Sequence, residues 1–198
     1  MSLVDKTWER VTIHHAVLEW LRAERFTNLT RLFAQLPPEV WLSGLTALLD
    51  NANLNNADQN RARLRLLYMF RNVFVLEIPP DTEWFLVSNL MDDELSELHV
   101  VNYPEWVDPA DRNELVKAAA RRKLTLRTPT SSWAMPILWG HDRCGPFTIL
   151  EGNHRLAAYV FSGTRGLETR VIVGLSPMKC VWHILDECQF LMQDLLRR

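Results

Sequence analysis

Apolar residues recur every three or four positions between Ile13 and Glu24, with polar residues between them. This spacing places Val17, together with Trp20 or Leu21, on one face of an amphipathic helix. The Pro37-Pro38 pair ends the pattern and suits the first turn of a new helix. Three more helices and a loop are predicted in this part of the chain: helices at 27–36, 38–49 and 61–70, and an asparagine-rich loop at 50–60.

The pattern changes near residue 72, where β-branched and aromatic residues cluster in NVFVLEIPPDTEWFLV. Pro79-Pro80 divides this stretch into two short strand candidates. The apolar run WAMPILW, residues 133–139, contains a proline and is therefore expected at a sheet edge or in the first residues of a strand. Further elements are predicted on both sides of this run: strands within 91–106, at Thr148–Leu150 and in 169–175, and helices in 113–124, 156–161 and 176–196.

This order of elements indicates an α+β fold. Helices come first and short strands follow, so the helical part is expected to cover one face of a small mixed sheet. We therefore expect a helical N-terminal region at 1–72 that packs on the sheet of an α+β domain at 73–198.

Composition narrows the classes of function. The 198 residues carry a formal net charge of -2, which gives no long-range attraction to nucleic acid or to an anionic membrane. The three cysteines are an odd number without CxxC spacing, so neither a disulfide framework nor a zinc site is predicted. The N-terminal segment lacks the features of a signal peptide, and no apolar run is long enough to span a bilayer. We expect a cytoplasmic protein with free thiols.

Candidate chemistry gathers in the segment GPFTILEGNHRLAAYV, which predicts a turn, a strand, a polar elbow and a helix. The start of a helix carries a partial positive charge and unpaired backbone N–H groups, and Gly152 permits a ligand to approach them. Arg155 can hold phosphate oxygens through two parallel hydrogen bonds, and His154 adds a donor. Glu151 fits beside a phosphate if it binds Mg²⁺ or takes a proton from a reacting hydroxyl.

A second interpretation of the elbow needs no ligand. Glu151 and Arg155 are four residues apart, which is the spacing of an ion pair on a helix surface. In that case EGNHR is a tight turn whose polar groups satisfy one another.

The elbow resembles that of the ParB/sulfiredoxin-like fold, also called the ParB-like nuclease domain superfamily. EGNHR follows a strand and LAAY continues as a helix, and Met135-Pro136-Ile137 stands where the family has a short strand with a proline. The resemblance covers the second half of the chain only. By position, Gly152, His154 and Arg155 match phosphate-binding residues, and Glu151 matches an acidic residue of kinase-like relatives.

One position departs from the sulfiredoxin branch of the family. Sulfiredoxins carry their reactive cysteine where this chain has Asn153, so reduction of sulfinic acids is not expected here. Cys144 precedes the strand and is a poor substitute. The helix-turn-helix segment of centromere-binding ParB proteins is not visible in the C-terminal remainder either.

The resemblance implies a protein that binds a nucleotide (ATP, ADP or CTP) or another phosphorylated small molecule, with Mg²⁺ as a candidate companion ion. If it is an enzyme, a phosphotransferase or nucleotide hydrolase is expected, with Glu151 and His154 as catalytic residues. Gly152, Asn153, His154 and Arg155 would bind the phosphates. Two alternatives stay open: a nucleotide-gated binding module without turnover, and a protein-interaction domain with no nucleotide chemistry. A homo-oligomer is compatible with each, whereas nucleic acid and membranes are not expected partners.

Other polar and aromatic residues give weaker indications. The histidines outside the elbow lie on different predicted elements without metal-ligand spacing, so no protein-built metal site is predicted. Trp133 or Trp139 could stack on a base, although large aromatic residues more often fill a core. Glu105 is an outside candidate for a second carboxylate at the elbow.

Overall fold

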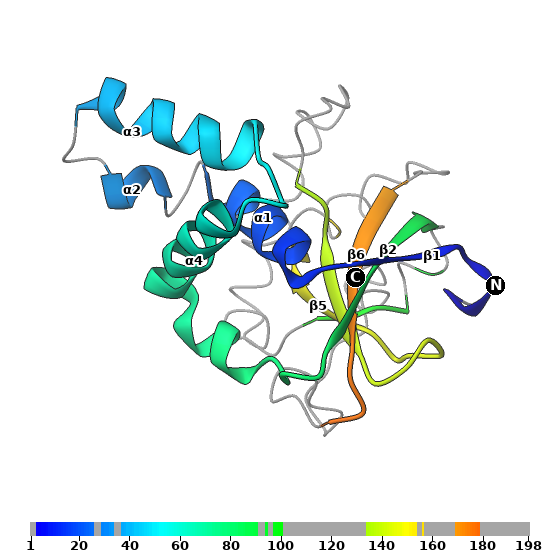
Figure 1. The fold of residues 1–198 in the computed structure, drawn as a ribbon. Helices are drawn as coiled ribbons and strands as arrows, with labels where there is room; N and C mark the ends of the chain where they lie inside the picture. The colour runs from blue at the N-terminus through cyan, green and yellow to red at the C-terminus, as the bar shows by residue number, and fades with distance from the viewer. Residues whose placement is uncertain are drawn as a thin grey trace, which may run out of the picture.

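In the computed structural model, residues 3–25, 29–33, 37–90, 94, 97–100, 134–153, 156 and 169–178 are described. Their strands form one six-stranded mixed sheet with the order β1-β2-β6-β4-β5-β3, and the helices gather at one end and on one face of it (Figure 1). The strands are β1 (Trp8–Val11), β2 (Glu83–Leu90), β3 (His99–Val100), β4 (Ile137–Gly140), β5 (Thr148–Glu151) and β6 (Thr169–Leu175).

The helices whose bounds lie within the described residues come from the N-terminal part of the chain. A short 3-10 turn, η1 (Leu3–Asp5), precedes β1, and a π-helical turn, η3 (Thr46–Asp50), continues the third α-helix. The α-helices are α1 (Ile13–Glu24), α2 (Thr30–Phe33), α3 (Pro38–Leu45) and α4 (Ala57–Glu77). The expected α+β class is thus confirmed at the level of a mixed sheet with several helices.

The sheet combines both strand directions. β6 pairs with β4 in parallel and with β2 antiparallel, so it lies between the two halves of the sheet. β5 pairs antiparallel with β4 and in parallel with β3, and β1 pairs antiparallel with β2 at the other edge. Pro136 directly precedes β4, as expected for a proline in a strand, but β4 itself lies inside the sheet rather than at its edge.

Alternation along the central strands produces two separate cores. Successive side chains of a strand point to opposite faces. In β6, Val171 and Val173 therefore enter one hydrophobic cluster, whereas Ile172 enters the other. The same alternation assigns Leu138 to the first cluster and Trp139 to the second. Both faces of the sheet are thus covered by apolar side chains.

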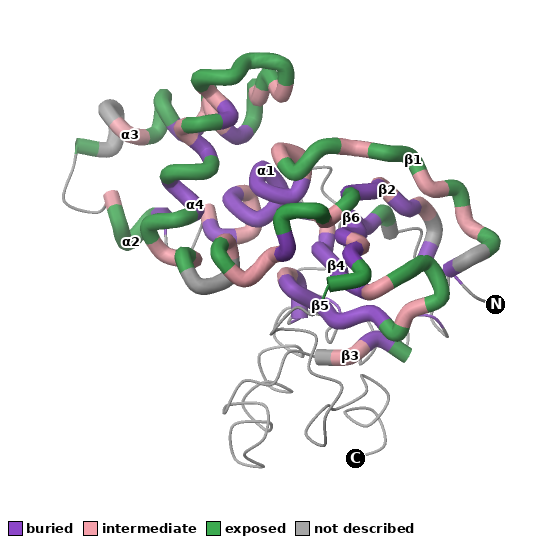
Figure 2. Tube along the Cα trace, turned by 60° about the horizontal axis from the view of Figure 1, so that its bottom comes forward, coloured by how far each residue is buried: buried purple, intermediate pink, exposed green. Residues whose placement is uncertain are grey.

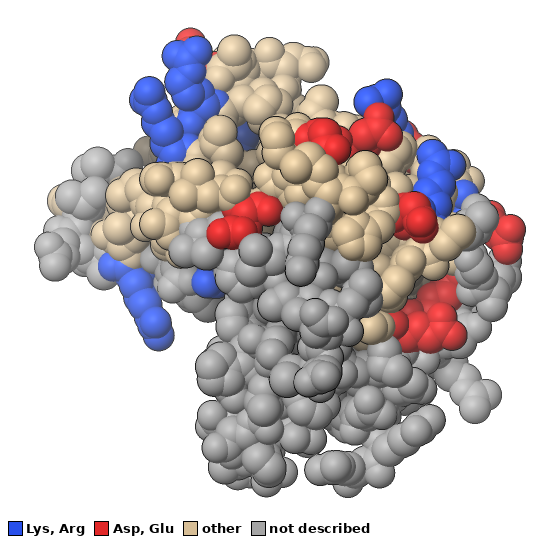
Figure 3. Space-filling model, turned by 90° about the horizontal axis from the view of Figure 1, so that it is seen from below, with Lys and Arg blue, Asp and Glu red and all other residues tan. Residues whose placement is uncertain are grey.

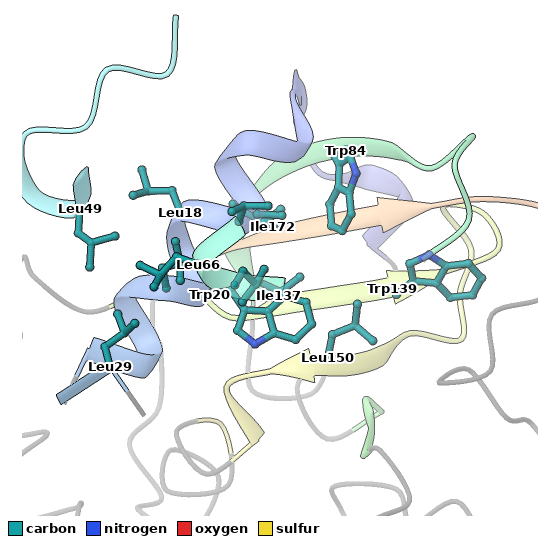
Figure 4. Close-up of a cluster of buried hydrophobic side chains, with 14 of the residues drawn as sticks. Leu18, Trp20, Leu29, Leu49, Leu66, Trp84, Ile137, Trp139, Leu150 and Ile172 are labelled. Carbon is teal, nitrogen blue, oxygen red and sulfur yellow. The ribbon is translucent and has the colours of Figure 1, made fainter. Parts of the chain in front are cut away.

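The helices cover the face of the sheet that carries Ile172 and Trp139. Their apolar residues share one cluster with the sheet, and Trp20 of α1 lies against Ile137 and near Leu150 (Figure 4). The buried parts of the trace run through α1 and the central strands, whereas α3 and β1 are largely exposed (Figure 2). The N-terminal helices thus pack on this face of the sheet.

Two sequence-based expectations for this region were wrong. The predicted strand in NVFVLEI is helical, because α4 continues to Glu77. The expected boundary between residues 72 and 73 consequently falls inside a helix. In addition, residues 8–11 are not part of a helical region but form β1, which pairs with β2 in the register Trp8 with Val87.

Local capping explains where α1 and α4 begin. The His15 backbone N–H donates to the Thr12 carbonyl, and the Thr12 N–H donates to Nδ1 of His15, so α1 starts with a reciprocal cap. Asn56 Oδ1 accepts hydrogen bonds from the N–H groups of Asp58 and Gln59, each at 3.0 Å, at the start of α4.

A buried guanidinium holds the loop between η3 and α4. Arg63 of α4 is fully buried, and its two terminal nitrogens donate to the carbonyls of Leu48 at 2.8 Å and Asn53 at 3.0 Å, and to the side chain of Asn60. Arg22 of α1 adds two hydrogen bonds to the Leu49 carbonyl. Cations at the carboxyl end of a helix satisfy its last carbonyls and its dipole.

A second arginine ties α4 to α1. Arg71 donates through Nε to Glu24 at 2.8 Å and also pairs with it through its terminal nitrogen. Arg71 has non-helical dihedrals, φ -131° and ψ 33°, so α4 is kinked at this residue. Glu24 is 4% exposed. It can occupy a position in the apolar stripe of α1 because the cation of Arg71 compensates the cost of burying its charge.

His14 is expected to make the stability of this region depend on pH. Burial lowers the pKa of His14 below its usual value of 6.5, and the charges of Arg63 and His15 lower it further. The folded protein therefore binds fewer protons than the unfolded chain below about pH 6.5. The stability that neutral His14 contributes is present above that pH and is lost as the pH falls.

Unfolding by urea at several pH values tests this for the wild type and for His14→Gln, which has no titrating group at position 14. We expect the wild type to lose more stability than His14→Gln between about pH 7.5 and pH 5. In Arg63→Met, the pKa of His14 measured by NMR should rise. A pKa of His14 at or above 6.5 in the wild type would contradict the expected direction.

Candidate functional site

The predicted elbow is present at the end of β5. β5 ends at Glu151, Gly152 follows with φ at +99°, and the Leu156 N–H donates to the Gly152 carbonyl at 2.9 Å. That hydrogen bond spans four residues, so a helical turn begins directly after the glycine. A positive φ of this size is readily adopted by glycine and costly for other residues. The chain therefore changes from strand to helix at Gly152.

Asn153 is the first residue of this helical turn, and its side chain is turned back toward the strand. Its side-chain amide nitrogen donates to the Ile149 carbonyl at 3.4 Å, and the residue is 7% exposed. Its Oδ1 is buried and has no hydrogen-bond partner. Asn153 therefore contributes its backbone N–H to the start of the helical turn, whereas its side-chain amide is turned toward the strand.

The predicted site residues divide into two groups. Glu151 is half-buried, and Gly152 and Asn153 are buried. These three residues lie together at the end of β5 because they are adjacent in the sequence. His154 and Arg155 lie outside the described residues. Glu105 and Trp133 lie outside them as well, and their predicted roles stay predictions.

The neighbourhood of the elbow includes a carboxylate that the sequence did not indicate. Glu151 pairs with Ile137 at the start of β4. Two residues earlier, the Met135 N–H donates to Oε2 of Glu19 at 2.7 Å, while Oε1 of Glu19 accepts from Arg22 at 2.6 Å. Both oxygens of this buried carboxylate are thus engaged, and Glu19 anchors α1 beside the elbow.

Only half of the Glu19 arrangement had a signal in the sequence. Glu19 and Arg22 are three residues apart in a predicted helix, which is the spacing of an ion pair. The contact to Met135 joins residues 116 positions apart and has no local signal.

A second polar cluster lies at the opposite end of β4 and β6. His141 Nδ1 lies 3.2 Å from the Ser176 carbonyl oxygen, and the Ser176 hydroxyl donates to Asp81 at 2.7 Å. The same hydroxyl oxygen accepts from the Met178 N–H at 3.0 Å. Because the imidazole faces a carbonyl and Ser176 is 1% exposed, this is a capping network and not a nucleophile with its base.

The other candidates from the sequence have ordinary structural positions. Trp139 is fully buried in the core, so its ring offers no surface to a base. Cys144 is exposed and free, as expected for a thiol, in the turn between β4 and β5. Among the described residues, no three His, Cys, Asp or Glu side chains are grouped to hold a metal ion. No helix within the described ranges is both long enough and apolar enough to cross a membrane.

Comparisons of the chain with protein-family models, with curated proteins and with solved structures found no match. The resemblance to the ParB/sulfiredoxin-like fold consequently depends on the sequence of the elbow and of the strand before it.

Proposed function

We propose that the chain binds the phosphates of a nucleotide at the elbow formed by Glu151 to Arg155. The observation that supports this is the positive φ of Gly152 between the end of β5 and the first helical turn. Such an elbow presents the backbone N–H groups of a helix start, with their partial positive charge, to an anion. A glycine has no side chain to obstruct that approach.

The roles of the elbow residues follow from their chemistry. The backbone of Gly152 and Asn153 binds phosphate oxygens, and the guanidinium of Arg155 adds two parallel charge-assisted hydrogen bonds. His154 contributes a further donor to the transferring phosphoryl group. Gly152 and Asn153 are buried, so a ligand that reaches their backbone must displace the groups that cover it.

Glu151 separates an enzyme from a binding module in this proposal. A carboxylate beside phosphates repels them. Such a carboxylate is useful despite this repulsion where it accepts a proton from an attacking hydroxyl or water. One carboxylate does not make a metal cage, but Mg²⁺ is usually held by one or two carboxylates together with substrate phosphates, so the residues fit that ion. Bound Mg²⁺ would neutralise charge on the phosphates.

Two substitutions at the elbow are expected to act on different quantities. Arg155→Ala should weaken the binding of ATP, ADP or CTP by roughly ten- to a hundredfold, because it removes a charge-assisted contact of on the order of 1.5–3 kcal/mol. Glu151→Gln should retain or tighten binding without Mg²⁺, since repulsion is removed, while phosphate release falls to background. Isothermal titration and a phosphate-release assay measure the two effects.

Arg10→Ala is the matched control, because Arg10 is an exposed arginine on β1, at the edge of the sheet away from β5. It should leave binding and turnover unchanged. If Glu151→Gln weakens binding as much as Arg155→Ala and also lowers the unfolding temperature, Glu151 and Arg155 form a structural ion pair, and the proposal is wrong. Retained binding without any phosphate release in the wild type would identify the binding module instead.

A further inference from the structure

The outer face of α4 has an unusual composition. Residues 61, 64, 65, 68 and 69 are spaced to share one side of the helix, and the opposite side carries residues 60, 63 and 67. The inner side buries Leu66 and Leu67 together with the polar Asn60 and Arg63. The outer side exposes Tyr68 and Met69, with exposed fractions of 46% and 65%. A helix that only covers its own core normally carries polar side chains on its outer side.

Leu64 continues this exposed surface, because it is 36% exposed and lies one turn before Tyr68. We call the surface formed by Arg61, Leu64, Arg65, Tyr68 and Met69 the α4 face. It is contiguous along two helical turns and combines an aliphatic, an aromatic and a thioether side chain. Met and Tyr are among the residues that are enriched where proteins contact partners.

The charges on the α4 face are positive. The side chain of Arg61 is 63% exposed, and its ion pair with Asp58 is long, at 3.7 Å. Arg65 is exposed and makes no hydrogen bond or ion pair among the described residues. The chain as a whole has a formal net charge of -2, so the positive charge here is local. Basic side chains project from the helical end of the molecule when it is viewed from below (Figure 3).

We propose that the α4 face is a docking surface for an amphipathic helix of another protein, with an apolar stripe flanked by Asp or Glu. The apolar stripe of the partner would cover Leu64, Tyr68 and Met69. Its carboxylates would meet Arg61 and Arg65, and an aligned carboxylate and guanidinium form two parallel hydrogen bonds. The site is separate from the elbow, so this proposal does not depend on nucleotide binding.

The probe for this proposal is a synthetic peptide of about 15–18 residues, long enough to form a helix alone, with leucines on one face and glutamates beside them. The comparison peptide has lysine in place of every glutamate. We expect the glutamate peptide to bind the full chain with a dissociation constant in the micromolar range, and the lysine peptide to bind at least about tenfold more weakly. Fluorescence anisotropy measures both affinities.

Charge reversal provides the decisive variant. In Arg61→Glu/Arg65→Glu the preference should invert, so that the lysine peptide binds more tightly than the glutamate peptide. Arg10→Glu, an exposed arginine on β1, is the matched control and should leave the preference as it is in the wild type. Binding of both peptides with equal affinity, or a preference that survives the double reversal, would overturn the proposal.

Footprinting with hydroxyl radicals localises the contact and tests other occupants. Tyr68 and Met69 should be oxidised in the free protein and protected by the glutamate peptide. Protection already in the free protein, lost on dilution together with a fall in sedimentation coefficient, would show a second copy of the chain on this face. Protection that persists on dilution would show that the chain covers the face itself. Either result overturns the proposal.

Discussion

Trp20→Ala is expected to lower the free energy of unfolding by about 3–5 kcal/mol, which is the usual cost of removing a large aromatic side chain from a core. Trp20 is 2% exposed and lies where α1 meets the sheet (Figure 4). Its loss leaves a cavity against Ile137 and removes contacts from the cluster that joins the helices to the strands. Urea unfolding followed by circular dichroism measures the effect.

Leu42→Ala on α3 is the control for this substitution, because Leu42 is 42% exposed. It should change the free energy of unfolding by less than about 1 kcal/mol, as is usual for surface positions. If Trp20→Ala were as mild as Leu42→Ala, then α1 does not rest on the sheet in solution as it does in this structure.

Arg63→Met is expected to cost on the order of 3–5 kcal/mol, although methionine retains the apolar stem of arginine. The substitution leaves the carbonyls of Leu48 and Asn53 and the side chain of Asn60 without their donor. The bond to Asn60 is buried and the two bonds to carbonyls are part-buried, and a buried acceptor that loses its partner costs about 1–3 kcal/mol. Arg63→Lys should recover only part of this, because an ammonium group cannot reach all three acceptors in the fork geometry of a guanidinium.

Hydrogen exchange of the loop at 51–56 gives a readout specific to this role. The backbone amides of this loop should exchange faster in Arg63→Met, because the substitution removes the hydrogen bonds from the guanidinium that hold the loop. Arg65→Met, two positions along α4 and exposed, should affect neither stability nor exchange. Equal effects of the two substitutions would mean that burial of Arg63 is not what stabilises the loop.

The central strands were predictable because their signal is local. Thr148–Leu150 and TRVIVGL are short apolar runs bounded by turns, and both became strands. Helical spacing identified α1 equally well, and Glu24 fits the stripe because Arg71 neutralises it. The pattern could not show that partner, since ion pairs between distant residues leave no periodic trace.

The failures of prediction have physical causes in tertiary context. NVFVLEI has strong β-propensity, but this preference reflects packing on a pleated surface more than the backbone itself. Here Val75 and Ile78 pack against the hydrophobic cluster between the helices and the sheet instead, and α4 continues to Glu77. β1 was missed because its four residues are too few to establish a two-residue period. A short edge strand is specified by the partner it pairs with.

The elbow was predicted in outline and not in detail. Glycine at 152, after an apolar strand, predicted the turn that the positive φ confirms. The inward rotation of Asn153 onto the Ile149 carbonyl could not be foreseen, because an amide has many local partners in a helix start. The anchoring of Met135 by Glu19 depends on the packing of α1 and was equally out of reach.

The central place of β6 has a consequence for the order in which the molecule assembles. Among the described strands, β1 and β2 form one half of the sheet and β4, β5 and β3 the other, and only β6 pairs with both halves. β6 is also the last described strand in the sequence, at residues 169–175. During synthesis from the N-terminus, the edges of β2 and β4 that pair with β6 therefore lack this partner until β6 has left the ribosome.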